Sequence, residues 1–120
     1  MENILIDFEV NEHGEEEMIC KLADFGFSTV LEYGQQTRKR LGTPLYMAPE
    51  IWKSQNYDTK VDIWALGILV YFLASGGRFP FNDFQEQKLN YKIRIVQPDL
   101  SFTKTTNYPD LLRDFLKSCL

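Results

Sequence analysis

Residues 61–74 decide the fold, and they read V-D-I-W-A-L-G-I-L-V-Y-F-L-A. Twelve of these fourteen residues are apolar, and the exceptions are Asp62 and Gly67. A helix that is apolar on every side, yet shorter than the ~20 residues of a membrane span, belongs inside a protein core. We therefore expect a buried central helix, which Ser75-Gly76-Gly77 ends.

The residues around this stretch predict further helices. Thr59-Lys60-Val61-Asp62 resembles a capping box, in which the Thr59 hydroxyl binds an early amide and the Asp62 carboxylate reaches back. A short helix is expected near residues 48–53, and weaker helical patterns cover residues 83–95 and 109–120. Asn107 or Tyr108 opens the last of these, with proline and aspartate in its first turn.

Two short apolar runs, residues 3–8 and 18–23, predict the strands of a β-hairpin with its bend at residues 11–14. The bend region is acidic, which is typical of a solvated turn. Its glutamates are Glu9, Glu12, Glu15, Glu16 and Glu17. Residues 24–45 read as a long loop, and loops of that length in compact domains are usually functional. The expected fold class is α+β, mostly helical.

Composition limits the function classes. A chain of 120 residues is one domain at most, and a net charge of −4 offers no basic field for nucleic acid or an anionic membrane. Neither a secretory signal nor a membrane span is expected, because Met1-Glu2-Asn3 lacks basic residues and no apolar run approaches ~20 residues. Cys20 and Cys119 form no CxxC motif, so we expect reduced thiols in the cytoplasm or nucleus.

Chemical motifs follow one another in a fixed order. Asp24-Phe25-Gly26 comes directly after the second predicted strand, and alone it would most often be an ordinary turn. G-T-P-L-Y-M-A-P-E at residues 42–50 comes next, and D-I-W-A-L-G at residues 62–67 begins the apolar helix. In this order the motifs closely resemble the C-lobe of a eukaryotic-type protein kinase domain, over essentially the whole chain. Gly42-Thr43-Pro44 resembles serine/threonine rather than tyrosine kinases.

The resemblance implies ATP and Mg²⁺ as cofactors of the parent kinase, with weak or no binding expected for residues 1–120 alone, and proteins with serine or threonine hydroxyls as substrates. Phosphoryl transfer requires positioning and charge neutralisation, and magnesium prefers oxygen ligands. The Asp24 carboxylate and the Asn3 amide oxygen are the implied metal ligands. Leu5 matches the apolar floor beneath adenine, although an ordinary core leucine satisfies the pattern equally well. Nothing in the sequence indicates an oligomeric state.

Residues 27–43 then correspond to the activation segment. Phe25 matches the family's aromatic residue whose packing separates active from inactive arrangements, and Gly26 is expected to supply backbone freedom at the hinge. Lys39 occupies the place where many related kinases carry an activating threonine, which leaves Thr37 as the best phosphorylation candidate. The other candidates are Ser28, Thr29 and Tyr33. Residues 38–40 are either a solvated basic face or a pairing site for phosphate.

Three further residues take roles from the family. The resemblance implies that Thr43 supports catalysis by contacting the catalytic aspartate. It implies that Glu50 pairs with an arginine farther along the lobe, and that Asp62 accepts hydrogen bonds from the backbone of the catalytic loop. Among kinases, residues 23–28, 46–50 and 55–60 look most like the unc-51-like and calmodulin-dependent-type groups.

The sequence departs from the family at its start. The catalytic loop normally reads H-R-D-L-K-P-E-N, and only Glu2-Asn3 remain of it, so the catalytic base would lie upstream of Met1. Residues 1–120 are therefore expected to be a partial kinase domain that lacks the N-lobe and the extreme C-lobe. Loss of the base alone costs roughly 10²- to 10⁴-fold, so this chain by itself is expected to be inactive. The alternative is a non-catalytic kinase-like binding module that docks partners through the activation segment and residues 83–95.

Overall fold

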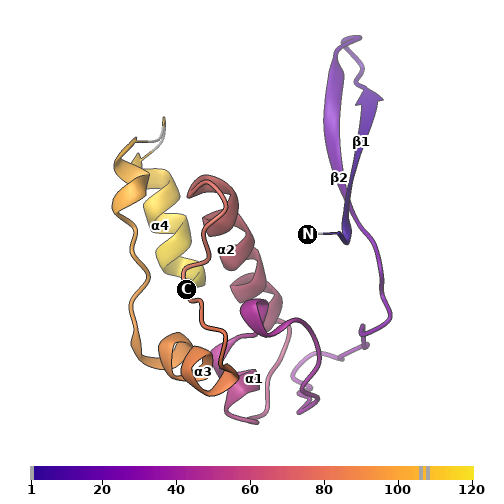
Figure 1. The fold of residues 1–120 in the computed structure, drawn as a ribbon. Helices are drawn as coiled ribbons and strands as arrows, with labels where there is room; N and C mark the ends of the chain where they lie inside the picture. The colour runs from indigo at the N-terminus through magenta and orange to yellow at the C-terminus, as the bar shows by residue number, and fades with distance from the viewer. Residues whose placement is uncertain (1, 106, 108) are drawn as a thin grey trace. The chain divides into compact units, whose positions relative to one another are not determined.

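The computed structural model describes residues 2–105, 107 and 109–120. The chain divides into two compact units, Met1–Val30 and Leu31–Leu120. The described residues contain a two-stranded antiparallel sheet in the first unit and four α-helices in the second (Figure 1). The fold class is α+β, as the sequence predicts.

The first unit is a β-hairpin. Strand β1 (Ile4–Val10) pairs antiparallel with β2 (Glu16–Leu22), in a register that sets Ile4 opposite Leu22. The side-chain oxygen of Asn11 accepts hydrogen bonds from the backbone N–H groups of His13 and Glu15, both at 3.0 Å, and so closes the bend. The predicted hairpin and the position of its bend are confirmed.

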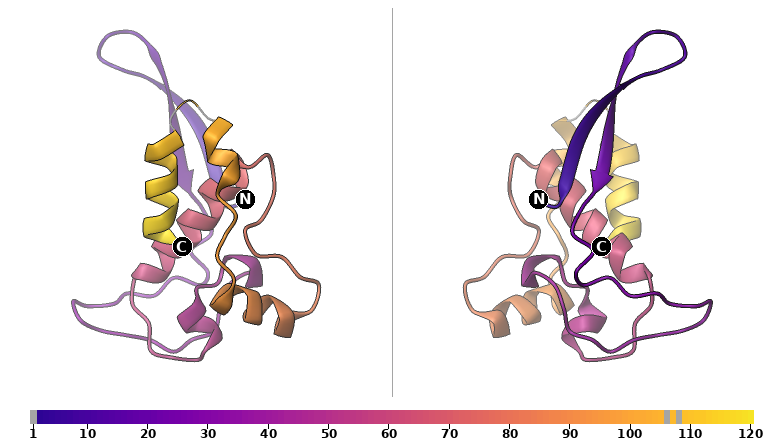
Figure 2. Two further views of the ribbon diagram at one scale, coloured as in Figure 1. Left: turned by 90° about the vertical axis from the view of Figure 1, so that its left-hand side faces the viewer. Right: turned by 90° about the vertical axis from the view of Figure 1, so that its right-hand side faces the viewer.

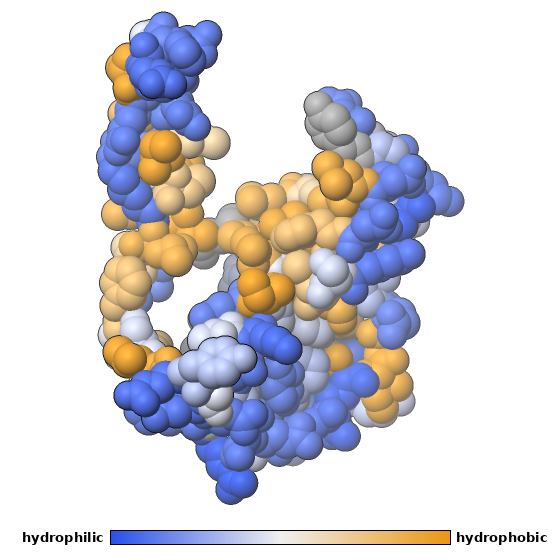
Figure 3. All heavy atoms as spheres, turned by 180° about the vertical axis from the view of Figure 1, so that it is seen from behind, coloured by the Kyte–Doolittle hydropathy of each residue, from blue (hydrophilic) through white to orange (hydrophobic). Residues whose placement is uncertain are grey.

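The two faces of this hairpin differ in chemistry. Side chains alternate along a strand, so the register places seven apolar residues on one face, which we name the apolar hairpin face. Its members are Ile4, Ile6, Phe8, Val10, Met18, Cys20 and Leu22. On the opposite face, Lys21 Nζ lies 2.6 Å from Asp7 Oδ2 and 3.1 Å from Glu9 Oε1. The bond from Lys21 holds the pKa of Asp7 below its ordinary value. In Figure 3 the tip of the hairpin is hydrophilic, and hydrophobic residues gather below it.

The second unit is helical. Its α-helices are α1 (Pro49–Trp52), α2 (Lys60–Ala74), α3 (Glu86–Ile95) and α4 (Pro109–Cys119). Two 3₁₀ helices, η1 (Pro44–Tyr46) and η2 (Ser101–Thr105), complete it. Helices α2 and α4 lie side by side (Figures 1 and 2), and α1 packs against α3. The core cluster consists of Met47, Ala48, Ile51, Trp52, Ile68, Phe81, Leu89 and Ile93.

The expectation that α2 is buried on every side is wrong. Only Gly67, Ile68 and Tyr71 are buried, whereas Ile63 is 50% exposed and Leu73 is 61% exposed. The core cluster and α4 pack against the helix, but Leu66 is also 42% exposed. Helix α2 is therefore central in the sequence but half-exposed in the structure.

The start of α2 also differs from the prediction. Thr59 makes no side-chain capping bond, because its own backbone is already helical, with φ −64° and ψ −12°. Its carbonyl accepts the N–H of Asp62, and the Asp62 carboxylate does not reach back. Instead, Asp58 Oδ1 accepts the N–H of Lys60 at 2.8 Å. The cap is therefore one residue earlier than the sequence pattern indicates.

The remaining helices agree with the sequence, except that α3 begins at Glu86, three residues later than predicted. Ser75 ends α2, and Gly76 and Gly77 follow with φ values of +74° and +88°. The predicted helices near residues 48–53, 83–95 and 109–120 correspond to α1, α3 and α4. Of the two residues predicted to open the last helix, Tyr108 lies outside the described residues, as does Met1. No helix in the described part of the chain is long and apolar enough to cross a bilayer.

Candidate functional site

Asn3 and Asp24 lie side by side at the open end of the hairpin. The N–H of Ala23 donates to the carbonyl of Asn3 at 2.8 Å, so the strand pairing continues one step beyond the sheet. This pairing brings together two residues that are 21 positions apart, and Asn3 Nδ2 lies 3.4 Å from Asp24 Oδ2. Both side chains are exposed. The two predicted metal ligands therefore lie next to each other.

Asp24 has an unusual backbone conformation. Its φ is +60°, in the left-handed region that few residues other than glycine adopt. Its Oδ1 accepts the N–H of Gly26 at 3.1 Å, which holds the carboxylate in place. Gly26 itself has no positive φ, so the hinge predicted there is not visible as a special backbone conformation. Gly26 instead supplies space, because a Cβ there would lie 3.1 Å from Asp24 Oδ1.

The chemistry of this pair fits magnesium. A carboxylate and an amide offer the hard oxygen atoms that Mg²⁺ prefers, and this ion is usually held by one or two protein groups together with phosphates and water. Within the described residues there is no cluster of three or more His, Cys, Asp or Glu side chains that could hold a metal ion. Donor type and number both suit a nucleotide-bound magnesium ion.

Two apolar residues beside this pair are exposed. Leu5 is 55% exposed and lies on the charged face of the hairpin, opposite Lys21. It is therefore no ordinary core leucine in this structure. Phe25 is 68% exposed, and its carbonyl accepts hydrogen bonds from the N–H and the hydroxyl of Ser28 at 3.0 and 2.7 Å. Thr29, the third phosphorylation candidate, is also exposed.

Thr37 belongs to the second unit and is fixed there by its backbone. It forms an isolated antiparallel bridge with Tyr57, with both N–H···O distances at 2.9 Å. The Tyr57 hydroxyl donates to the carbonyl of Lys39, and Arg38 Nε donates to the side-chain oxygen of Asn56. This segment is anchored to the chain that precedes α2.

Arg40 is bound by two side chains. Its guanidinium carbon lies 4.5 Å from the centre of a Trp52 ring, and its Nη2 lies 3.1 Å from Glu86 Oε2. Residues 38–40 are all exposed, as expected for a solvated basic face, and Arg38 and Arg40 are in addition bound by side chains of the protein. Sequence reasoning missed this pairing, because nothing in the sequence connects position 40 with positions 52 and 86.

The three remaining predicted residues lie around η1, α1 and α2. Thr43 precedes η1, and its carbonyl accepts the N–H of Tyr46 at 3.0 Å. It also lines a hollow of about 340 Å³ together with Pro44, Leu45, Asn82, Asp83, Phe84, Glu86 and Leu89. Glu50 is half-buried and Asp62 is exposed. Neither carboxylate has an ion-pair partner among the described residues.

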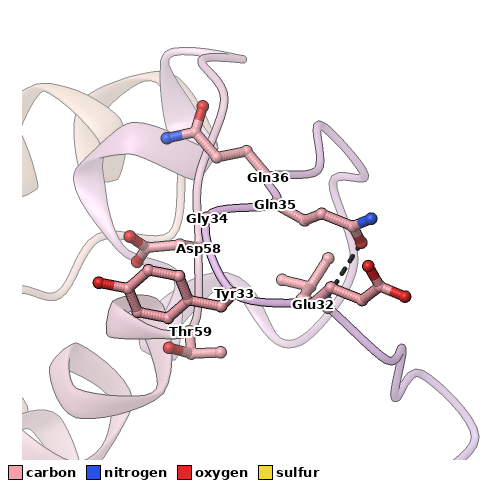
Figure 4. Close-up of a pocket in the computed structure, with 8 residues that line it drawn as sticks. Glu32, Tyr33, Gly34, Gln35, Gln36, Asp58 and Thr59 are labelled. Carbon is pink, nitrogen blue, oxygen red and sulfur yellow. Dashed lines mark hydrogen bonds between the residues drawn. The ribbon is translucent and has the colours of Figure 1, made fainter.

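A second hollow, of about 480 Å³, lies between residues 31–36 and Asp58-Thr59 (Figure 4). Its wall is a tight turn, in which Gln35 N donates to the Glu32 carbonyl at 2.9 Å and Glu32 N donates to Gln35 Oε1 at 3.1 Å. Tyr33 lies beside Asp58 and Thr59 in Figure 4 and is fully exposed. The hollow contains none of the predicted metal ligands.

Comparison with known proteins identifies the family. The sequence model of the protein kinase domain matches residues 1–120, so the chain belongs to the protein kinase family. A probable myosin light chain kinase of Dictyostelium discoideum is 37% identical over 106 residues, which cover 88% of this chain. Calcium-dependent protein kinase 4 of Plasmodium berghei is 34% identical over 119 residues, or 99% of this chain. The serine/threonine-protein kinase cst-1 of Caenorhabditis elegans is 39% identical over 103 residues, or 85% of this chain.

The chain spans only part of these relatives. It covers 27% of the Dictyostelium kinase, 21% of the Plasmodium kinase and 20% of the Caenorhabditis kinase. The family in general uses ATP and Mg²⁺ and acts on proteins. The names of the relatives agree with the serine/threonine class that Gly42-Thr43-Pro44 indicates.

Proposed function

We propose that residues 1–120 form the C-lobe portion of an ATP-dependent protein serine/threonine kinase, in which Asn3 and Asp24 hold magnesium against the nucleotide phosphates. The observation that carries this proposal is the 3.4 Å distance between Asn3 Nδ2 and Asp24 Oδ2, which brings the two side chains together at the open end of the hairpin. The left-handed backbone of Asp24 adds to it, since strained conformations concentrate at functional sites.

Each residue has a definite part in this proposal. The Asp24 carboxylate supplies the charged ligand, which the N–H of Gly26 orients, and the Asn3 amide oxygen supplies the neutral one. Bound magnesium would neutralise phosphate charge and align the terminal phosphoryl group. Leu5 offers an exposed apolar side chain beside the same site for the adenine ring. Thr43 contributes to the docking of the substrate, and Thr37 is the leading phosphorylation candidate.

The 120-residue chain by itself is proposed to be inactive. Its single histidine, His13, is followed by Gly14 rather than by Arg-Asp, so these residues contain no H-R-D catalytic base. Base catalysis alone contributes roughly 10²- to 10⁴-fold. Purified residues 1–120 should therefore transfer no γ-phosphate to a mixture of protein substrates in the presence of Mg²⁺ and ATP.

A chimera tests the metal ligands. Residues 1–120 would replace the matching segment of calcium-dependent protein kinase 4, whose own sequence would supply the N-lobe and the base. We expect phosphate transfer by the chimera and a loss of about a hundredfold or more in kcat on Asp24→Asn, because a metal ion contributes several kcal/mol to the transition state. Asp114→Asn in α4 is the matched control and should leave the rate unchanged. Equal rates for both variants would contradict the assignment of Asp24.

A binding module is the second candidate, and one observation favours it. The hollow between η1 and α3 is lined by Pro44, Leu45 and Leu89, and Phe84 at its edge is fully exposed. Such a surface suits a peptide that carries an apolar side chain. Retention of a substrate peptide by purified residues 1–120, without any phosphate transfer, would support this function.

A further inference from the structure

Four consecutive residues, 37–40, each make a specific contact with the rest of the second unit. Thr37 bridges to the backbone of Tyr57, and the Tyr57 hydroxyl donates to the carbonyl of Lys39. Arg38 binds Asn56, and Arg40 binds Trp52 and Glu86 as described above. The segment has no helix or strand of its own, so these contacts determine its position.

The Arg40 contacts are well suited to holding a loop. A guanidinium is planar, so one face can stack on an aromatic ring while its edge donates to a carboxylate. Trp52 is only 7% exposed and belongs to the core cluster, which makes it a rigid platform. Glu86 is in the first turn of α3, where the helix dipole favours a negative charge. Arg40 therefore links a loop to the core at one end and to a helix at the other.

These contacts engage Arg38 and Arg40, two of the three basic side chains beside Thr37, whereas Lys39 contributes only its backbone. A phosphate on Thr37 that paired with these two arginines in full would compete with Asn56 for Arg38 and with Glu86 for Arg40. Thr37 Oγ1 is itself 3.4 Å from the N–H of Lys39, so the hydroxyl faces back into the segment. The contacts that hold residues 37–40 therefore form without a phosphate on Thr37.

We propose that Arg40 is a positioning residue, which fixes the activation segment to α1 and α3 without phosphorylation of Thr37. Arg40 thereby shapes the hollow between η1 and α3, where the substrate would dock. Glu86 lines that hollow together with Thr43, so the Arg40–Glu86 pair borders the place where the substrate would dock. The role in substrate docking rests on the proposed function. The contacts of Arg40 with Trp52 and Glu86 can be tested without phosphate transfer.

Limited proteolysis tests the contact, because trypsin cuts after Arg38, Lys39 and Arg40 and cleavage follows the population of the open segment. The sample is residues 1–120 made in bacteria, with the absence of phosphate verified by mass. A peptide of residues 31–45 gives the unprotected rate. We expect cleavage at these three bonds to be at least tenfold slower in the chain than in the peptide, and Thr37→Ala to preserve this protection.

Substitutions of Arg40 and Glu86 test the ion pair between them. Glu86→Ala should raise the rate of cleavage after Arg38 about threefold, in line with the modest strength of exposed ion pairs. Glu32→Ala, in a turn without a side-chain ion pair, is the matched control and should change nothing. Arg40→Glu should also accelerate cleavage after Arg38, and Arg40→Glu combined with Glu86→Arg should restore the slow rate. Cleavage after Arg113 in α4 reports global unfolding and should stay constant.

Three results would overturn the proposal. These are cleavage as fast as in the free peptide, protection that appears only after Thr37 is phosphorylated, and a charge-exchanged double variant that is no slower than its single variants. None of these results depends on catalysis, so this inference and the proposed function can fail separately.

Discussion

Cys119 of α4 lies so close to Gly67 of α2 that a Cβ atom added to Gly67 would be 2.5 Å from the Cys119 Cβ. The same added atom would be 3.0 Å from Leu120 Cδ2. Gly67 therefore allows the two helices to pack in direct contact. In the sequence Gly67 is one of the two exceptions in the apolar run, and the structure identifies what it packs against.

Gly67→Ala should destabilise the helical unit by about 1–2 kcal/mol. Overpacking of this kind costs about 1–3 kcal/mol, and the better helix propensity of alanine returns about 0.5–1 kcal/mol. Urea unfolding followed by circular dichroism measures the change. In a Cys119→Gly background, which removes the clashing atom, the same substitution should cost little. An equal loss in both backgrounds would show that the Cys119 contact is not the cause.

Asp58→Ala should destabilise α2 by about 1 kcal/mol, which is typical for the loss of a side-chain cap. Asp58 Oδ1 accepts the N–H of Lys60 at 2.8 Å, whereas Thr59 makes no side-chain capping bond. Thr59→Ala is therefore the matched control and should have almost no effect in the same urea experiment. A larger loss of stability from Thr59→Ala than from Asp58→Ala would support the capping box that the sequence pattern predicts and contradict the cap at Asp58.

The sequence predicts elements whose signals are local. The hairpin follows from two apolar runs around an acidic bend, and α2 follows from an uninterrupted apolar stretch. The cap was misassigned because Asp58 and Thr59 are both good capping residues and the backbone conformation decides between them. The burial of α2 was overestimated because apolar composition reports what a helix could bury, whereas the neighbours determine what it does bury.

Stability should fall at low pH partly through Asp83. The N–H of Gln85 and then the ammonium of Lys92 lower the pKa of Asp83 below its ordinary value of 3.8. Because the folded pKa is the lower one, this carboxylate stabilises the fold above the unfolded pKa, and the contribution is lost as pH falls through the folded pKa. Carbon-13 titration of the Asp83 carboxyl should give a midpoint below 3.8, and Lys92→Ala should raise it. A midpoint above 3.8 would contradict the assigned contacts.

The site could be predicted from the sequence only in part. Asn3 and Asp24 follow from motif order, because a hairpin returns the chain to its starting point and so brings their two positions together. The left-handed backbone of Asp24 and the binding of Arg40 by Trp52 and Glu86 could not be predicted. Both depend on a long loop without periodicity, and such a loop carries no signal of which distant residues it will contact.

Residues 1–120 should self-associate through the apolar hairpin face. Phe8 and Val10 are 63% and 68% exposed, and contiguous exposed apolar surface promotes aggregation. Phe8→Lys should reduce the associated fraction in sedimentation velocity, whereas Ile19→Lys, on the opposite face, should have a smaller effect. A sharp cooperative thermal transition of the unmodified chain as a monomer would contradict this expectation.

The central claim is that Asn3 and Asp24 present oxygen atoms to one divalent cation, and a Mn²⁺ titration of nitrogen-15-labelled residues 1–120 tests it most directly. Mn²⁺ broadens amide signals near the place where it binds. We predict that the amides of Asn3 and of Asp24 to Gly26 broaden first, that Asp24→Asn abolishes this effect, and that Asp7→Asn preserves it. Broadening that centres on the glutamates of the hairpin bend and is unchanged by Asp24→Asn would contradict the claim.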